Sequence, residues 1–255
     1  LYMGLPIFTK LYKVTGDQKL LDKQYECFVW TDSLLFDTED FLYYRDAKYI
    51  YPKVKTACNG GKSFWARGDG WVLAGLAKVL QDLPKDSKYR PFYVKRFQQL
   101  AEGVARCQQE EGYWSRSMLC EDDAPGYETS GTAFFTYGLL WGMNNGMLDK
   151  ATYQPVVDKA WNYLTKTALQ ADGTVGYVQP IGEKAIKGQT LSAKSVTNFG
   201  TGAFLLAACE KVRFDDASVK PADKKAFTVS VRNDSESFRQ EVVEIDANAV
   251  YAKLG

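Results

Sequence analysis

The sequence has 255 residues, 45% of them hydrophobic and 14% aromatic, which is enough for one large domain with a sizeable core. Lys and Arg total 32 against 31 Asp and Glu, so the net charge of +1 argues against a nucleic-acid binder, whose domains are strongly basic. The lack of histidine excludes Ser-His-Asp and Cys-His catalysis and imidazole-ligated metal sites, so proton transfer falls to carboxylates, lysine, tyrosine or cysteine.

The chain begins with Leu1 in an apolar, helix-like segment. There is no signal peptide and no run of about 18 apolar residues, so we expect no membrane span. Four apolar segments begin with a glycine, at Gly4, Gly70, Gly131 and Gly202. A helix that is apolar on every side must be buried, so these segments predict inner helices.

Amphipathic segments follow the first three, near residues 21–35, 97–104 and 157–168, and their apolar side chains have helical spacing. Alternating buried and half-exposed helices predict an all-α fold with an inner ring inside an outer one, an (α/α) toroid. An open solenoid is the alternative, although uniformly apolar inner helices favour closure. About seven helices are expected, fewer than a closed ring of hairpins needs, so residues 1–212 predict an incomplete toroid domain.

The C-terminal part has a different pattern. Residues 213–226 are polar and predict a linker. Beyond them, residues 227–231 and 241–245 alternate with period two on either side of a turn, so residues 227–255 are expected to form a β-hairpin or the start of an accessory β domain.

The cysteines are odd in number and lack CxxC spacing. We therefore expect them to be small buried hydrophobic residues, rather than a disulfide framework or a metal cluster. The five positions are Cys27, Cys58, Cys107, Cys120 and Cys209.

The starts of the inner helices are the candidate binding region, because free backbone N–H groups and the helix dipole favour anions there. Arg67 and Trp71, at i and i+4, can present a guanidinium to a carboxylate and an indole face to a sugar. The structural alternative places Trp65 and Trp71 in the core and Arg67 in an ion pair. Earlier in the chain, Arg45 adds positive potential and Tyr44 lines the pocket, unless Arg45 only pairs with its neighbour in solvent.

Two carboxylates, Asp69 and Glu128, lie at the same helix starts and are candidates for an acid/base pair. Helix capping explains the neighbouring Thr129 and Ser130 equally well. The distance between the two carboxylates decides this question, and the sequence does not supply it.

Several motifs together make residues 1–212 resemble glycoside hydrolase families 105 and 88, the unsaturated rhamnogalacturonyl and glucuronyl hydrolases. The resemblance implies a ring of six helical hairpins. It also implies an acidic oligosaccharide substrate with a 4,5-unsaturated uronate at the non-reducing end. In the mechanism that the resemblance implies, an aspartic acid protonates the enol-ether double bond, water adds, and the hemiketal opens to release the next sugar, and no metal or organic cofactor is expected. The motifs lie at residues 1–6, 12–17, 42–46, 65–71, 128–131, 141–146 and 176–180.

By this resemblance, Arg67 and Trp71 match the residues that hold the unsaturated ring. Arg45 stands where many members have histidine, and Asp69 where asparagine is frequent. The family's catalytic aspartate corresponds to a position two residues before Leu1, so we expect the chain as printed to be an inactive fragment.

The resemblance also implies a periplasmic or extracellular location, by family habit. From the charge balance and the lack of a long apolar run we expect no nucleic-acid or membrane partner. Two other functions stay open. One is an ordinary glycosidase or a lyase that uses Asp69 and Glu128, and the other is a non-catalytic sugar-binding barrel. The sequence leaves the linkage and the oligomeric state open as well.

Overall fold

The computed structural model describes residues 3–216, and the expected β-hairpin lies outside the described residues. This part is mainly helical, as expected, and contains no named strand. The last helix ends at Asp215, so residues 213–215, where the linker was expected to begin, are helical. The seven α-helices of the described part are α1 (Leu5–Thr15), α2 (Gln18–Leu35), α3 (Ala66–Asp82), α4 (Arg90–Arg106), α5 (Thr129–Asn144), α6 (Lys150–Tyr163) and α7 (Asn198–Asp215).

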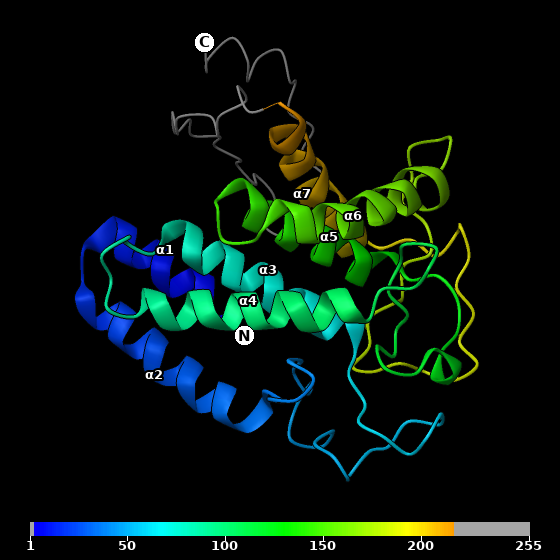
Figure 1. Cartoon of the computed structure of the whole chain (residues 1–255), viewed down its shortest axis with the longest axis horizontal. Helices are drawn as coiled ribbons and strands as arrows, with labels where there is room; N and C mark the ends of the chain where they lie inside the picture. The colour runs from blue at the N-terminus through cyan, green and yellow to red at the C-terminus, as the bar shows by residue number, and fades with distance from the viewer. Residues whose placement is uncertain (1–2, 217–255) are drawn as a thin grey trace, which may run out of the picture. The chain divides into compact units, whose positions relative to one another are not determined.

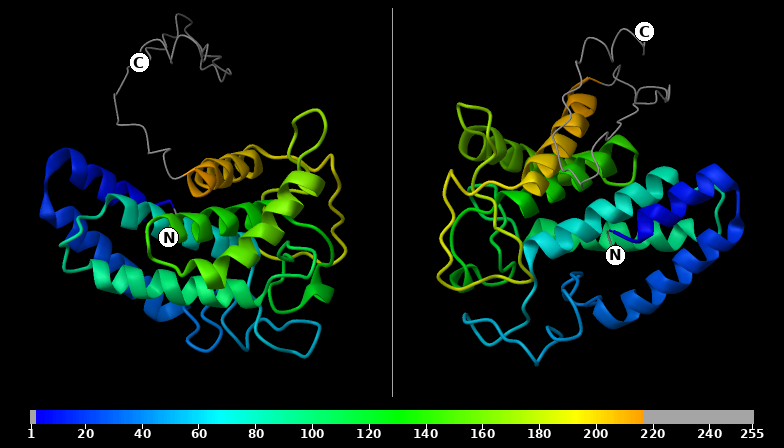
Figure 2. Two further views of the ribbon diagram at one scale, coloured as in Figure 1. Left: turned by 45° about the horizontal axis from the view of Figure 1, so that its top comes forward. Right: turned by 180° about the vertical axis from the view of Figure 1, so that it is seen from behind.

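The helices form two layers that alternate along the chain (Figures 1 and 2). In the inner layer α3 packs against α1 on one side and α5 on the other, and α5 packs against α7. In the outer layer α2 packs on α1, α4 on α3 and α5, and α6 on α5. This arrangement confirms the expected alternation of inner and outer helices.

The inner helices are more deeply buried in the middle of the layer than at its two ends. Every residue of α5 up to Met143 is buried, which explains its apolar composition on all sides. By contrast, α1 exposes Ile7 and Val14, and α7 exposes Leu205 and Val212. In the described part, α1 and α7 therefore stand at the ends of an open series of inner helices.

Helices α3 and α5 approach closely at their first turns, where two glycines lie between them. A Cβ atom on Gly131 would come within 3.1 Å of Ala66, and one on Gly70 within 2.9 Å of the Cβ of Phe134. Only a residue without a side chain permits this spacing. The contact brings the N-terminal ends of both helices together at one end of the inner layer.

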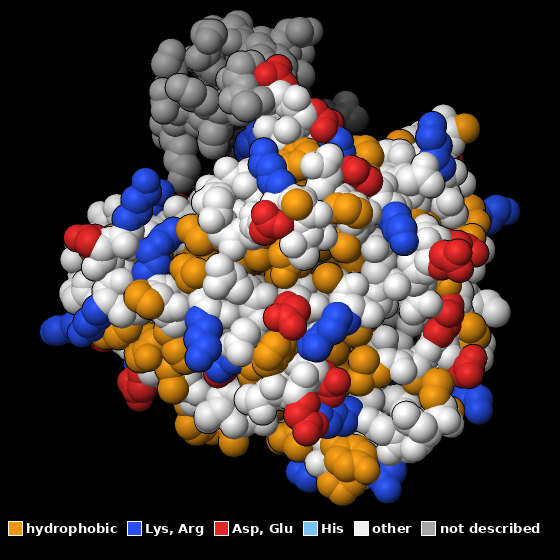
Figure 3. Space-filling view, viewed as in Figure 1, with side chains coloured by type: hydrophobic (Ala, Val, Ile, Leu, Met, Phe, Trp, Pro, Cys, Tyr) orange, Lys and Arg blue, Asp and Glu red, His pale blue; other side chains and the backbone are white. Residues whose placement is uncertain are grey.

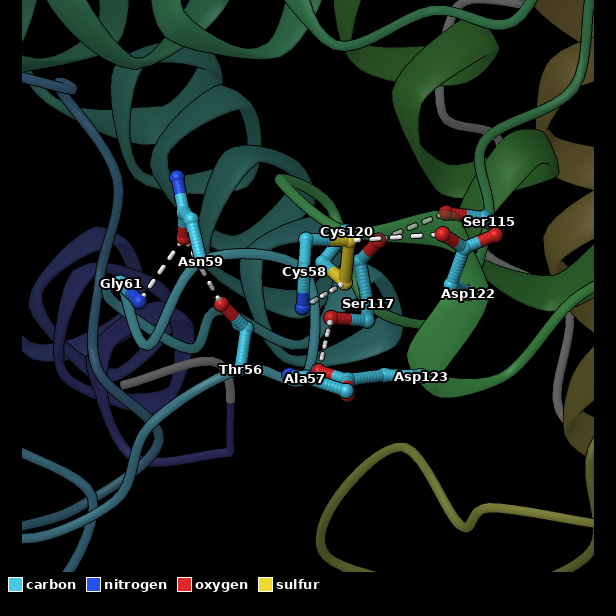
Figure 4. Close-up of a disulfide and its surroundings, with 10 residues drawn as sticks. All are labelled: Thr56, Ala57, Cys58, Asn59, Gly61, Ser115, Ser117, Cys120, Asp122 and Asp123. Carbon is cyan, nitrogen blue, oxygen red and sulfur yellow. Dashed lines mark hydrogen bonds between the residues drawn. A yellow bond between two sulfur atoms is a disulfide. The ribbon is translucent and has the colours of Figure 1, made fainter.

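The cysteine expectation is wrong at four of the five positions. Cys58 and Cys120 form a disulfide (Figure 4), although Cys120 is buried, and Cys27 and Cys209 are exposed. Only Cys107 is both buried and free, as expected. The two bonded cysteines are 62 residues apart. The segment after Cys58 pairs with the segment before Cys120. The backbone N–H of Met118 donates to the carbonyl oxygen of Phe64, and that of Ala66 donates to the carbonyl oxygen of Arg116. Sequence spacing does not reveal this pairing.

Basic and acidic side chains are interspersed on the face shown in Figure 3, in agreement with the near-zero net charge. In residues 3–216, no helix is both long enough and apolar enough to cross a membrane.

Candidate functional site

A cavity of about 450 Å³ opens beside the first turns of α3. Three separate parts of the chain form its walls: the end of α2 with the stretch after it, the start of α3, and the connection that leads into α7. The lining residues are Thr31, Leu35, Tyr43, Tyr44, Arg45, Trp65, Arg67, Gly68, Trp71, Val72, Ile181, Gly182 and Phe199.

All five predicted substrate-binding residues, Tyr44, Arg45, Trp65, Arg67 and Trp71, line this one cavity. They come from sequence positions up to 27 residues apart, and the fold brings them together. This placement meets the geometric requirement for a shared binding site. Their roles toward a ligand stay a prediction.

Arg67 is 3% exposed and has a structural task in the wall of the cavity. Its guanidinium donates to the carbonyl oxygens of Gln179 and Pro180 at 2.6 and 2.8 Å and to the hydroxyl of Ser130 at 3.3 Å. The guanidinium carbon lies 4.7 and 4.8 Å from the ring centroids of Trp65 and Phe199. Two of these bonds fix the connection into α7 against α3, and the third joins α3 to the first turn of α5.

The two tryptophans differ in their surroundings. The indole N–H of Trp65 donates to the side-chain oxygen of Gln179 at 2.9 Å, so this ring is tied to the same connection as Arg67. Trp71 is partly exposed at the cavity, and its ring packs against Phe134 with centroids 4.1 Å apart. Trp71 therefore offers the cavity an indole surface that is supported from behind.

Tyr44 and Arg45 line the cavity from the stretch that follows α2. The hydroxyl of Tyr44 donates to Asp37 at 3.2 Å, and burial together with this carboxylate raises the pKa of Tyr44 to about 12. The side chain of Arg45 is 40% exposed and pairs with Asp46, as the structural alternative expected, and with Glu183 at 3.9 Å. Arg45 is therefore the more accessible of the two arginines at the cavity.

Asp69 does not line the cavity. It is fully buried, and its Oδ1 accepts a hydrogen bond of 2.8 Å from the backbone N–H of Tyr43, whereas its Oδ2 has no partner among the described residues. Burial raises the pKa of the Asp69 carboxyl well above its usual range, and the Tyr43 bond only partly opposes this shift. A carboxylic acid in this position fixes the cavity wall from behind.

Glu128 does not line the cavity either. Its carboxylate caps α5 through the backbone N–H groups of Ser130 and Gly131 at 3.1 and 2.8 Å. It also accepts a bond of 3.0 Å from the backbone N–H of Gln179, and it lies 4.0 Å from Arg67. These bonds engage both of its oxygens, so capping and wall support account for this residue.

Sequence reasoning missed the connection into α7 as a wall of the cavity. Ile181, Gly182 and Phe199 line it, and none of them was a candidate. The available signal was the aromatic Phe199 in the first turn of an inner helix, close to a helix start as Trp65 is. The three-dimensional course of residues 179–182 carried no comparable signal.

A cluster of three acidic side chains has the spacing of a possible metal site. Asp37, Glu39 and Asp40 bring carboxylate oxygens within 4.8 Å of one another. The ammonium of Lys62 lies among them, at 2.8, 2.6 and 3.0 Å. Lys62 therefore already supplies the positive charge there.

Three comparisons relate the chain to known proteins. It is 38% identical over 219 residues to an "Unsaturated 3S-rhamnoglycuronyl hydrolase" of Formosa agariphila, an alignment that covers 85% of this chain and 57% of that protein. A solved structure, "Glycosyl hydrolase family 88 from Bacteroides vulgatus", is 58% identical with a TM-score of 0.81, covering 84% of this chain and 61% of that one. Another, named "Polysaccharide Lyase", is 62% identical with a TM-score of 0.82, covering 86% and 62%.

The chain thus spans little more than half the length of the curated relative it matches. Over the described part, the fold is that of the solved hydrolases of families 88 and 105, which are α/α toroids. The family model for Glycosyl Hydrolase Family 88 matches residues 1–215, and the chain therefore belongs to that family.

Proposed function

We propose that the full-length protein removes a 4,5-unsaturated uronic acid from the non-reducing end of an acidic oligosaccharide. One observation carries this proposal: the five residues expected to bind such a sugar line a single cavity of about 450 Å³, a volume suited to a small ligand. Membership of family 88 and the printed activity of the Formosa relative support it.

The cavity offers complementary groups to a flat, negatively charged ring. The indole of Trp71 presents an apolar face to the C–H surface of the sugar. Arg45 is exposed and provides the direct partner for the carboxylate, while the buried Arg67 adds positive potential and holds the wall in place. This division of roles differs from the sequence expectation, which gave carboxylate binding mainly to Arg67.

Hydration of a vinyl ether requires an acid that protonates the double bond and a base that activates water. Within residues 3–216, no Asp or Glu lines the cavity. The expected aspartate is therefore to be sought outside this range, and we propose that the described residues bind and orient the substrate.

The chain is also proposed to work in an oxidising compartment, the periplasm or the outside of the cell. The Cys58–Cys120 disulfide supports this, because such bonds persist there and are rare in the cytosol. Mass spectrometry of the protein from its native source, with free thiols alkylated first, tests the point. Alkylation of both cysteines would refute it.

A second candidate function is that of a polysaccharide lyase, favoured by the printed name of the relative at 62% identity. The two activities change the ultraviolet absorbance of the double bond in opposite directions. A hydrolase of this type lowers the absorbance of a lyase-generated unsaturated disaccharide, whereas a lyase raises the absorbance of a saturated uronate polymer. We expect a fall with the disaccharide and no change with the polymer. The opposite pair of results would replace the first proposal with the second.

A further inference from the structure

Gln179 is fully buried, and its side chain bonds to two separate walls of the cavity. It begins the loop of residues 179–189, here called the wall loop, which is part of the connection into α7 (yellow in Figure 1). Its side-chain oxygen accepts the indole N–H of Trp65 at 2.9 Å. Its amide nitrogen donates to the carbonyl oxygen of Lys184 at 2.9 Å and to the side-chain oxygen of Gln189 at 3.2 Å. One amide thus joins the start of α3 to the wall loop.

The orientation of the Gln179 amide is determined by its partners. The indole N–H of Trp65 can only donate, so the amide must turn its oxygen toward Trp65. The backbone carbonyl of Lys184 can only accept, so the amide must turn its nitrogen toward Lys184. An ionised carboxylate meets only the first requirement, and an apolar side chain meets neither. The position therefore needs an uncharged amide that reaches both partners.

Both ends of the wall loop are held by buried charged residues. At the first end, the backbone N–H of Gln179 donates to Glu128 at 3.0 Å, and its carbonyl oxygen accepts from Arg67 at 2.6 Å. At the far end, the guanidinium of Arg116 donates to the carbonyl oxygen of Gln189 at 2.7 Å and to its side-chain oxygen at 3.3 Å. Both arginines are buried. The side-chain bond from Gln179 to Gln189 therefore joins two fixed ends.

The wall loop carries residues that line the cavity, namely Ile181 and Gly182. A Cβ atom on Gly182 would lie 4.0 Å from the amide nitrogen of Gln179, so the loop passes directly over this side chain. On the other side of the amide, Trp65 and Arg67 also line the cavity, and the guanidinium carbon of Arg67 lies 4.7 Å from the Trp65 ring. Loss of the amide would therefore release the indole of Trp65 and the wall loop together.

We propose that Gln179 is a positioning residue for substrate binding, because its amide holds the Trp65 indole and the wall loop in the arrangement that receives the sugar. This inference rests on the proposed function and adds a residue that acts through others. Gln179 itself does not line the cavity. Since its bonds support the binding walls from behind, its loss weakens substrate binding more than it slows the chemical step.

The test compares the full-length wild type with Gln179→Met, which keeps the approximate size of the side chain and removes its amide. Gln24→Met is the matched control. Gln24 is also fully buried and donates from its amide to the backbone carbonyl of Leu5, but it lies in α2 and does not line the cavity. A second variant, Gln179→Asn, keeps an amide that is too short to reach both partners, and the same direction of change is expected for it.

Kinetics are measured by loss of ultraviolet absorbance from a lyase-generated unsaturated disaccharide, well below the Tm of every variant. For Gln179→Met we expect KM to rise about 5- to 20-fold, as for one or two lost hydrogen bonds, with kcat within about threefold of the wild type. Gln24→Met should lower Tm as well, but KM should stay within about twofold. An unchanged KM in Gln179→Met, a fall in kcat alone, or an equal rise of KM in Gln24→Met would overturn the proposal.

Failure of the proposed function gives a different result, namely no loss of absorbance even with the wild type. Two measurements without substrate then decide whether Gln179 holds the walls. NMR of protein labelled with 15N in the tryptophan indoles follows the N–H of Trp65, assigned with Trp65→Phe, and hydrogen exchange read by mass spectrometry follows the wall loop. In Gln179→Met, but not in Gln24→Met, the Trp65 resonance should shift and the loop amides should exchange faster. If either stays as in the wild type, the amide does not join the two walls and the proposal is wrong.

Discussion

Substitution of Asp69 by asparagine tests whether this residue supports the cavity wall or performs acid/base chemistry. The carboxyl is fully buried, and burial raises its pKa well above the usual range. Its one bond, from the Tyr43 backbone N–H, needs only an acceptor oxygen, which an asparagine also provides. Asp69→Asn should therefore leave the wall, and hence the kinetics, within about threefold of the wild type.

The effect of Asp69→Asn on the free energy of unfolding depends on pH. In the folded protein Asp69 keeps its proton above pH ~4, where an unfolded aspartic acid loses it. The folded state then binds more protons than the unfolded state, so the contribution of Asp69 is fully present below pH ~4 and is lost as pH rises toward the raised pKa. Asp69→Asn lacks this loss, so its free energy of unfolding relative to the wild type should increase as the pH rises above ~4, by up to ~1.4 kcal/mol per pH unit until the raised pKa is reached.

Urea unfolding at several pH values, for wild type, Asp69→Asn and Asp69→Ala, measures these differences. Asp69→Ala leaves the buried N–H of Tyr43 without an acceptor and should be less stable than Asp69→Asn by about 2 kcal/mol at every pH. Abolished activity in a stably folded Asp69→Asn, with no pH-dependent gain in stability, would show that Asp69 is an ionised catalytic group.

Three other predictions follow from the structure. Trp71→Ala removes the indole surface of the cavity and should lower kcat/KM about tenfold, equivalent to ~1.4 kcal/mol, and unchanged kinetics would exclude Trp71 from the site. Reduction of the Cys58–Cys120 disulfide should destabilise the chain by about 2–4 kcal/mol, visible as a lower Tm with reductant, whereas an unchanged Tm would contradict the cross-link. Gly103→Ala would place a Cβ 2.5 Å from a backbone oxygen and should cost about 1–3 kcal/mol in urea unfolding. The matched control Gly202→Ala meets nothing within 4 Å and should be neutral or slightly stabilising.

The helical architecture was predictable because burial determines composition locally. The glycine-started segment of α5 is apolar on all sides since it is enclosed on all sides, and α4 is amphipathic since it faces solvent. The grouping of Trp65, Arg67 and Trp71 followed in the same way, because a helix start fixes the relation of residues four apart.

The disulfide, the wall near residue 181 and the surroundings of the two carboxylates depend on contacts between distant segments, which the sequence does not show. Nothing near Cys58 or Cys120 shows that their segments pair, and nothing near residue 181 shows that it returns to the start of α3. Likewise, the sequence placed Asp69 and Glu128 at helix starts but did not show that both are bonded behind the cavity wall. Periodicity describes one element at a time, whereas these features arise from the packing of several.

The most direct test is a crystal structure of the full-length protein with an unsaturated disaccharide, under conditions in which turnover is too slow to consume it. We expect the unsaturated ring to lie on the indole of Trp71, with its carboxylate toward Arg45 in the 450 Å³ cavity. A disaccharide bound elsewhere, with this cavity empty, would contradict the account.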